Sequence, residues 1–182
     1  MKKIIFCTIA LMSANINFAQ SNFSEINQIG LANDTYVEQL GATNRSIVYQ
    51  DGSNNFSNLV QLGVSNLSNL EQIGSANVST VNQNGSTNVS NIVQLGTVNI
   101  SNLEQVGTRN INTVNQDGNA NESEVIQVGI DNTSDVTQEE ANNTNFINQL
   151  EGSETFDELE PPPGFIGELR AYQKRGFSWL HF

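Results

Sequence analysis

Cysteine, histidine and proline are almost missing from this chain of 182 residues, which contains one, one and three of them. The cysteine, Cys7, lies in the first segment, so the rest of the chain can form no disulfide and no cysteine metal site. The histidine, His181, is next to the last residue, where a lone histidine is more often incidental than catalytic. Because no nucleophile–base set and no metal-ligand cluster can be assembled, the sequence predicts a protein that is not an enzyme and needs no cofactor or metal.

Positive charge is also scarce, with 7 lysines and arginines against 19 acidic residues and a net charge of −12. Such a chain is not drawn to nucleic-acid phosphates, so no nucleic-acid partner is expected. Hydrophobic residues make up only 37% of the chain. Low hydrophobicity with polar repeats is typical of disorder, but the strict periodicity described below argues against disorder here.

The one long apolar run, Ile4–Met12, follows Lys2 and Lys3 and precedes Phe18-Ala19-Gln20. This layout predicts a secretory signal peptide over residues 1–19, cleaved after Ala19, and hence an extracellular protein. The run is too short to span a bilayer as a helix. A buried strand at the N-terminus is the alternative interpretation.

Glutamine recurs every eleven residues in one register. It stands at Gln28, Gln39, Gln50, Gln61, Gln72, Gln83, Gln94, Gln105, Gln116, Gln127, Gln138 and Gln149. Two places before each glutamine the residue is always aliphatic, as at Leu70 and Val81, and four places before it is usually Ser or Thr. These three positions share parity, so in a strand they point to one face.

A turn signal follows each glutamine, in the order x-Gly-x-x-Asn. The glycines are Gly30, Gly41, Gly52, Gly63, Gly74, Gly85, Gly96, Gly107, Gly118 and Gly129. Glycine takes positive φ without steric cost, and asparagine, as at Asn33, Asn44 and Asn55, bonds its own turn and tolerates the left-handed region. Each unit is therefore predicted to be a strand of about six or seven residues and one tight turn.

A unit this short cannot bury its own face, so about twelve copies over residues 20–152 must stack as an all-β solenoid. We predict two strands per coil, so that each strand pairs in parallel with the next strand but one along the chain. A three-sided coil, with three repeats in each turn, is the alternative. It would stack Glu38, Glu71 and Glu104 directly on one another, which is unfavourable for like charges.

Inside this solenoid the aliphatic residues should form a dry seam, flanked by ladders of Ser, Asn and Gln. A buried amide is costly unless it is bonded, and amides spaced by about 4.8 Å can bond their neighbours above and below. The predicted self-assembly ladder comprises Gln28, Asn33, Gln39, Asn44, Gln50, Gln61, Asn66, Gln72, Asn77, Gln83, Asn88, Gln94, Asn99, Gln105, Asn110, Gln116, Gln127, Gln138 and Gln149.

The pattern Q-x-G-x-x-N-x-[ST/A]-x-Φ-x-Q, with Φ aliphatic, closely resembles the curlin repeat of bacterial curli subunits. The resemblance implies a secreted β-solenoid that polymerises into extracellular amyloid fibres for adhesion and biofilm. It also implies export through an outer-membrane channel and nucleation on a minor subunit. In the family the outer repeats drive assembly, and here these would carry Gln28, Asn33, Gln39 and Asn44. One departure is Glu140, which stands where the other repeats have glycine.

The composition changes from Ser153 onward. Residues 153–164 form an acidic linker that ends in three prolines, and residues 165–182 form an aromatic and basic tail with helical spacing. The tail's L-R-x-Y-Q-x-x-G-x-x-W-L resembles the opening of Swi/Snf-type helicase-like ATPases, where the glutamine, here Gln173, helps to recognise adenine. The phosphate loop and the acidic pair of such motors are missing, so a truncated fusion is the first interpretation. A tail that packs on the solenoid end, or docks on a nucleator or a membrane surface, is the second.

Three functions follow. The first is a self-assembling fibre subunit, because open solenoid ends expose strand edges that template another copy. The second is a monomeric secreted adhesin or binding module. The third, which rests on the tail alone, is a fragment of an ATP-dependent DNA translocase.

Overall fold

The computed structural model describes residues 21–150 of the chain, so the predicted signal peptide, linker and tail lie outside the described residues. Within residues 21–150 all regular structure is β-strand, and none of it is helix that could cross a membrane. The strands are β1 (Phe23–Leu31), β2 (Asp34–Ala42), β3 (Arg45–Ser53), β4 (Phe56–Val64), β5 (Leu67–Ser75), β6 (Val78–Ser86), β7 (Val89–Thr97), β8 (Ile100–Thr108), β9 (Ile111–Asn119), β10 (Glu122–Ile130), β11 (Thr133–Ala141) and β12 (Thr144–Leu150).

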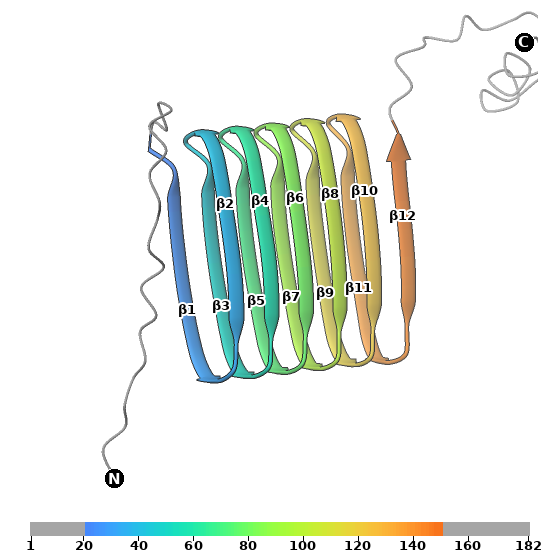
Figure 1. The fold of residues 1–182 in the computed structure, drawn as a ribbon. Coiled ribbons are helices and arrows are strands. Elements are labelled where there is room, and N and C mark those ends of the chain that lie inside the picture. Colours follow the sequence, from blue (N-terminus) through green and yellow to red (C-terminus); the bar gives the residue numbers. More distant parts are fainter. Residues whose placement is uncertain (1–20, 151–182) are drawn as a thin grey trace, which may run out of the picture. The chain divides into compact units, whose positions relative to one another are not determined.

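The strands form two parallel sheets of six, with the odd-numbered strands in one and the even-numbered strands in the other (Figure 1). Each strand pairs with the next strand but one along the chain, as β3 does with β5, which places Gln50 beside Gln72. The β-solenoid with two strands per coil is therefore confirmed, and the three-sided coil is wrong. Glu71 lies in the odd sheet and Glu38 and Glu104 in the even sheet, so these like charges do not stack.

Eleven of the strands have nine residues, not the six or seven predicted. The glycine lies inside the strand, still paired with the next glycine, as Gly52 is with Gly74. Its φ lies between 105° and 133° in all ten repeats, which lets the backbone bend without leaving the ladder.

The turn itself contains only two residues, and the residue in the left-handed region is the one before the asparagine of each repeat, such as Val98 (φ 59°). Asparagine, which tolerates this region, does not need to adopt it here. As predicted, its side chain instead bonds its own turn, as Asn66 Nδ2 does with the carbonyl of Leu62.

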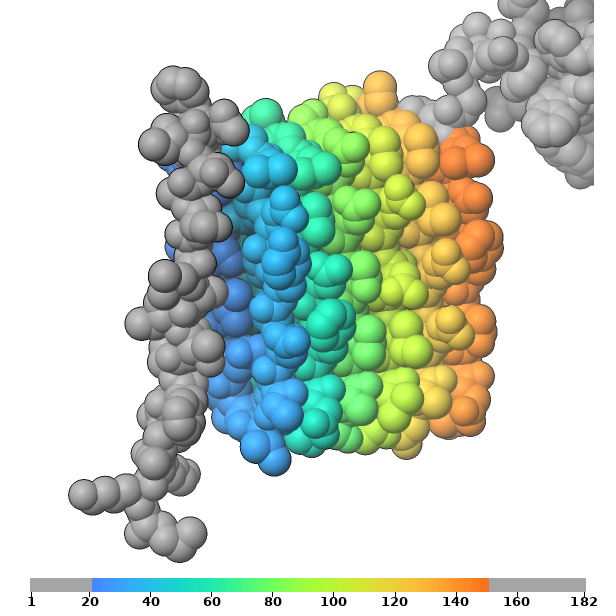
Figure 2. All heavy atoms as spheres, viewed as in Figure 1, coloured from blue at the N-terminus to red at the C-terminus, as the bar shows by residue number. Residues whose placement is uncertain are grey.

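The core is one line of aliphatic side chains between the two sheets. Its buried members are Val48, Leu59, Leu70, Val81, Ile92, Leu103, Val114, Val125 and Val136, with Val37 and Ile147 packed against its ends. The coils follow one another along the stack, so the order of colours in sequence is also the order in space (Figure 2). Each coil therefore contacts only its neighbours, and the first and last coils have one face without a neighbouring coil among the described residues.

Candidate self-assembly edges and ladders

The glutamine side chains form two continuous ladders inside the coil, one for each sheet. In each ladder the Nε2 group donates a hydrogen bond to Oε1 of the glutamine 22 residues later, with distances from 2.7 to 2.9 Å. The eight glutamines from Gln50 to Gln127 are fully buried. All the bonds run in the same direction along the stack, so the ladders are polar.

From Gln39 onward the second N–H of each amide bonds a backbone carbonyl across the core, which was not predicted. Gln83 Nε2 donates to the backbone carbonyl of Leu67, 16 residues earlier and in the opposite sheet, at 3.0 Å. The same bond recurs at Gln61 with Arg45 and at Gln72 with Phe56. Because the acceptor is a backbone carbonyl, the side chain of the accepting residue can vary from repeat to repeat. The bond therefore leaves no signal in the sequence. Glutamine thus ties the two sheets together as well as the coils, which leucine could not do.

The asparagines form a second pair of ladders at the turns. The backbone N–H of Asn66 donates to Oδ1 of Asn44 at 3.0 Å, and Asn66 Nδ2 donates to the carbonyls of Leu62 and Gly85 at 3.1 Å each. Each asparagine thus closes its own turn and holds the coils above and below. Five asparagines in the same register were not predicted as ladder residues but join this ladder: Asn22, Asn55, Asn121, Asn132 and Asn143.

The predicted serine column is present, but it is not hydrogen-bonded along its whole length. At the N-terminal end Ser46 Oγ donates to Ser24 Oγ at 3.0 Å, and Thr35 bonds Ser57 at 2.8 Å. Farther along, the hydroxyls of six buried serines have no partner among the residues that the structure describes: Ser68, Ser79, Ser90, Ser101, Ser123 and Ser134. Within the described part of the chain the hydroxyl column is therefore bonded only at its N-terminal end, whereas the glutamine ladders are bonded along the whole stack.

At each end of the described stack the last glutamine of each ladder lacks one of its two glutamine–glutamine hydrogen bonds. Within residues 21–150, no glutamine donates to Oε1 of Gln28 or Gln39 at the N-terminal edge. Likewise Gln138 and Gln149, at the C-terminal edge, donate only to the backbone carbonyls of Glu122 and Thr133. One end therefore offers unused amide acceptors, and the other offers unused amide donors.

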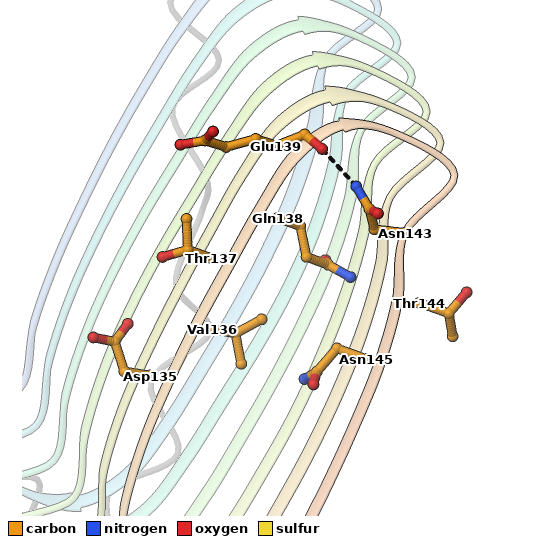
Figure 3. Close-up of a pocket in the computed structure, with 8 residues that line it drawn as sticks. All are labelled: Asp135, Val136, Thr137, Gln138, Glu139, Asn143, Thr144 and Asn145. Carbon is orange, nitrogen blue, oxygen red and sulfur yellow. Dashed lines mark hydrogen bonds between the residues drawn. The ribbon is translucent and has the colours of Figure 1, made fainter.

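The C-terminal edge is an open, polar end of the coil. A depression of about 400 Å³ lies there between β11 and β12 (Figure 3). Val136, Gln138 and Asn145 extend into the space between the strands, while Asp135, Thr137 and Glu139 lie on the other side of β11 (Figure 3). A further coil stacked on this edge would cover Val136, Gln138 and Asn145.

The described surface has few interacting charges. The one ion pair in residues 21–150 joins Arg109 Nε to Asp131 Oδ1 at 2.6 Å, on adjacent turns. Arg109 lowers the pKa of the Asp131 carboxyl by donating hydrogen bonds to it, and Asp131 raises the pKa of Arg109. Among the same residues, no group of three His, Cys, Asp or Glu side chains is placed to hold a metal ion.

Comparison with known proteins adds one finding. A family model described as the curlin associated repeat matches the chain twice, at residues 30–63 and 107–139. No curated protein matches the chain. The matches support a curlin-repeat protein and agree with the resemblance found in the repeats, whereas the helicase-like resemblance of the tail stays a prediction that falls outside the described residues.

Proposed function

We propose that this chain, which carries curlin associated repeats, is a structural subunit of extracellular curli-like amyloid fibres. It serves adhesion and the biofilm matrix through self-templated β-stacking and has no catalytic role. The repeat match and the solenoid fold support the coarse part of this proposal. Secretion by the predicted signal peptide, an outer-membrane export channel and a nucleating subunit are parts of it that rest on the resemblance.

The observation that carries the proposal is that the two open edges match each other. Continuing the same strand register past β12 would place β1 of a second copy beside β11 and its β2 beside β12. The unused donors of Gln138 and Gln149 would then face the unused acceptors of Gln28 and Gln39. Every ladder bond made inside the coil has a counterpart at this junction.

The apolar side chains at the edges match in the same way. Val136 would meet Ile26, which is 39% exposed at the N-terminal edge. On the outer face of the even sheet, Phe146 (60% exposed) would meet Tyr36 (53% exposed). Aromatic cross-strand pairs of this kind stabilise a sheet, and unpaired strand edges template the addition of further strands.

One pair of charges opposes the junction. Asp135 would lie beside Glu25 of the next copy, and like charges placed opposite each other are unfavourable. Both side chains are exposed, so salt screens their repulsion. We therefore expect assembly to be faster at higher ionic strength, and Asp135→Asn to remove most of that salt dependence. An unchanged salt dependence in the variant would place the repulsion elsewhere.

The test is fibre formation by the purified chain from Gln20 onward. We expect thioflavin-positive fibres in electron micrographs and a cross-β reflection at about 4.7 Å. Gln28→Leu/Gln39→Leu removes the acceptors of one edge and should suppress fibres. The matched control, Asn58→Leu/Asn102→Leu, changes outward residues of the even sheet and should leave them intact. A wild-type chain that stays monomeric for days at high concentration would contradict the proposal.

A second candidate is a binding module, favoured by a shallow depression of about 460 Å³ on the outer face of β3, β5 and β7. It is lined by Ile47, Tyr49 and Val93 together with the carboxylate of Glu71. An aromatic ring beside polar groups suits a glycan surface. Loss of glycan-array binding in Tyr49→Ala, with fibre formation unchanged, would support this function.

A further inference from the structure

The glycine column controls whether one coil can stack on another. A Cβ atom at Gly74 would lie 1.9 Å from the carbonyl oxygen of Gly96 in the next coil. The same holds for all nine glycines from Gly30 to Gly118, with distances from 1.6 to 2.1 Å. Since these distances are far inside van der Waals contact, a residue with a side chain in this column obstructs the coil that follows it.

The last position of this column in the odd sheet is not glycine. Glu140 pairs with Gly118 in the strand ladder and occupies the glycine position of β11. Its backbone keeps a positive φ of 69°, and its carbonyl accepts the bond from Asn121 Nδ2, at 3.2 Å, that other coils give to glycine. Glu140 therefore pairs with Gly118 of the preceding coil as a glycine would. On its other side it presents a side chain to any coil that would follow β11.

No described strand stacks on this side of β11, which is the edge strand of its sheet. This explains why the substitution is tolerated within the chain, since the Cβ of Glu140 meets no further coil among residues 21–150. In the sequence the next repeat has the same change, because Glu151 stands two places after Gln149 where ten repeats have glycine. The N-terminal edge, in contrast, keeps Gly30 and Gly41.

We infer that Glu140 closes the C-terminal edge against in-register addition of a second copy and so acts as a brake on elongation. This inference rests on the proposed function, since the arriving partner is the N-terminal edge of another copy of this chain. In register, the carbonyl of that copy's Gly30 takes the place into which the Glu140 side chain projects. The junction forms only after the β11 backbone has shifted, and this shift slows each addition.

The slower elongation is attributed to the Cβ atom of Glu140 and not to its charge. The variants are chosen to separate these two causes. Glu140→Gly removes the obstruction. Glu140→Gln keeps the Cβ without the charge, and Glu140→Ala keeps the Cβ alone. Because positive φ suits glycine, Glu140→Gly should leave the melting temperature of the monomer unchanged or slightly raised, so a faster assembly cannot be attributed to a less stable monomer.

The experiment measures elongation from preformed wild-type seeds by thioflavin fluorescence and by single-fibre atomic force microscopy. We expect Glu140→Gly to elongate about tenfold faster than wild type, and Glu140→Gln and Glu140→Ala to stay within about twofold of it. Adding Glu151→Gly to Glu140→Gly should raise the rate again.

The outcomes separate this inference from the function on which it rests. If wild type and Glu140→Gly form fibres at equal rates, the brake is wrong and the fibre function stands. If Glu140→Ala is as fast as Glu140→Gly, the Cβ is not the obstruction and the inference is also overturned. If no variant forms fibres under any condition, the proposed function fails and the inference fails with it.

Discussion

The inner coils, β3 to β10, and the edge coils, β1–β2 and β11–β12, are built from the same repeat but make different numbers of bonds. Gln83 in the inner coils is fully buried, donates to Gln105 and Leu67 and accepts from Gln61. Gln28 at the N-terminal edge is only half-buried and accepts no glutamine bond among the described residues. Each repeat completes its hydrogen bonds only through the coils on either side of it, so the first and last repeats keep unused donors or acceptors among the described residues. The bonds that stabilise the inner coils and the unused groups at the two edges therefore have one physical origin.

The two edges also differ from each other. The N-terminal edge keeps glycine in the stacking column, and the C-terminal edge has Glu140 there. The edges are thus complementary in hydrogen bonding but unequal in steric access. The substitutions below test how the inner coils and the edge coils differ in stability and in assembly.

The largest effect should come from a side chain in the stacking column of an inner coil. Gly74→Ala places a Cβ 1.9 Å from the Gly96 carbonyl oxygen at a φ of 122°. We expect a loss of about 4 kcal/mol or more in the free energy of unfolding, because backbone strain and a backbone clash combine. Chemical denaturation of the monomer, followed by circular dichroism, measures it. The neighbouring Ser75→Ala is the control and should have little effect, and a stable Gly74→Ala would show that the column tolerates a Cβ.

The second effect compares an inner glutamine with an edge glutamine. Gln83→Leu leaves the amide of Gln61, the carbonyl of Leu67 and Oε1 of Gln105 without their bonds, so we expect a loss of about 3 kcal/mol. Gln28→Leu should cost much less, because Thr35 Oγ1 still donates to Oε1 of Gln50 at 2.9 Å.

The measurement that sharpens this contrast records stability and assembly side by side. Gln83→Leu should lower the midpoint of denaturation, whereas Gln28→Leu should slow fibre growth with little change in the midpoint. Equal losses of stability in the two variants would mean that the edge coil is as tightly bonded as the inner coils.

A smaller effect of opposite sign is expected at Asn112 in β9. This residue occupies the serine column, is fully buried, and neither of its side-chain polar atoms has a partner among the described residues. We expect Asn112→Ser to raise the free energy of unfolding by about 1 kcal/mol, since an unsatisfied buried amide is lost. Asn110→Ser is the matched control and should lower it, because Asn110 bonds Asn88, Val106 and Gly129. Denaturation of the two variants in parallel would reveal an error if both changed in the same direction.

The smallest effect is expected at the exposed ion pair between Arg109 and Asp131. The pKa of Asp131 is lowered in the folded state, so the pair contributes stability above the ordinary aspartate pKa and loses it as the pH falls through the lowered value. Exposed pairs contribute little and are screened by salt. Asp131→Asn should therefore shift the melting temperature only slightly at pH 7 in low salt, and not at all in high salt. A shift that persists in high salt would contradict the assignment to this pair.

Much of the fold was accessible from the sequence because the period of eleven is short and the side-chain alternation of a strand is strict. The position of Gln61 relative to Leu59 placed both on one face, and the charges of Glu38, Glu71 and Glu104 favoured two sides over three. The predicted strand length was wrong because glycine in a sequence is interpreted as a turn signal. In the structure each glycine has φ above 100° and still continues the strand ladder, since it pairs with the glycine of the next coil.

The sequence alone therefore determined the repeat, the inward residues, the seam of Leu and Val and the family that the pattern resembles, since each depends on local periodicity. Only the tertiary structure decided which groups the amides bond across the core, which serines lack a partner among the described residues, and how closely the glycine column approaches the next coil. These features depend on distances between backbones 16 to 22 residues apart in the chain. The same residues in a looser stack would keep the pattern and lose every one of these contacts.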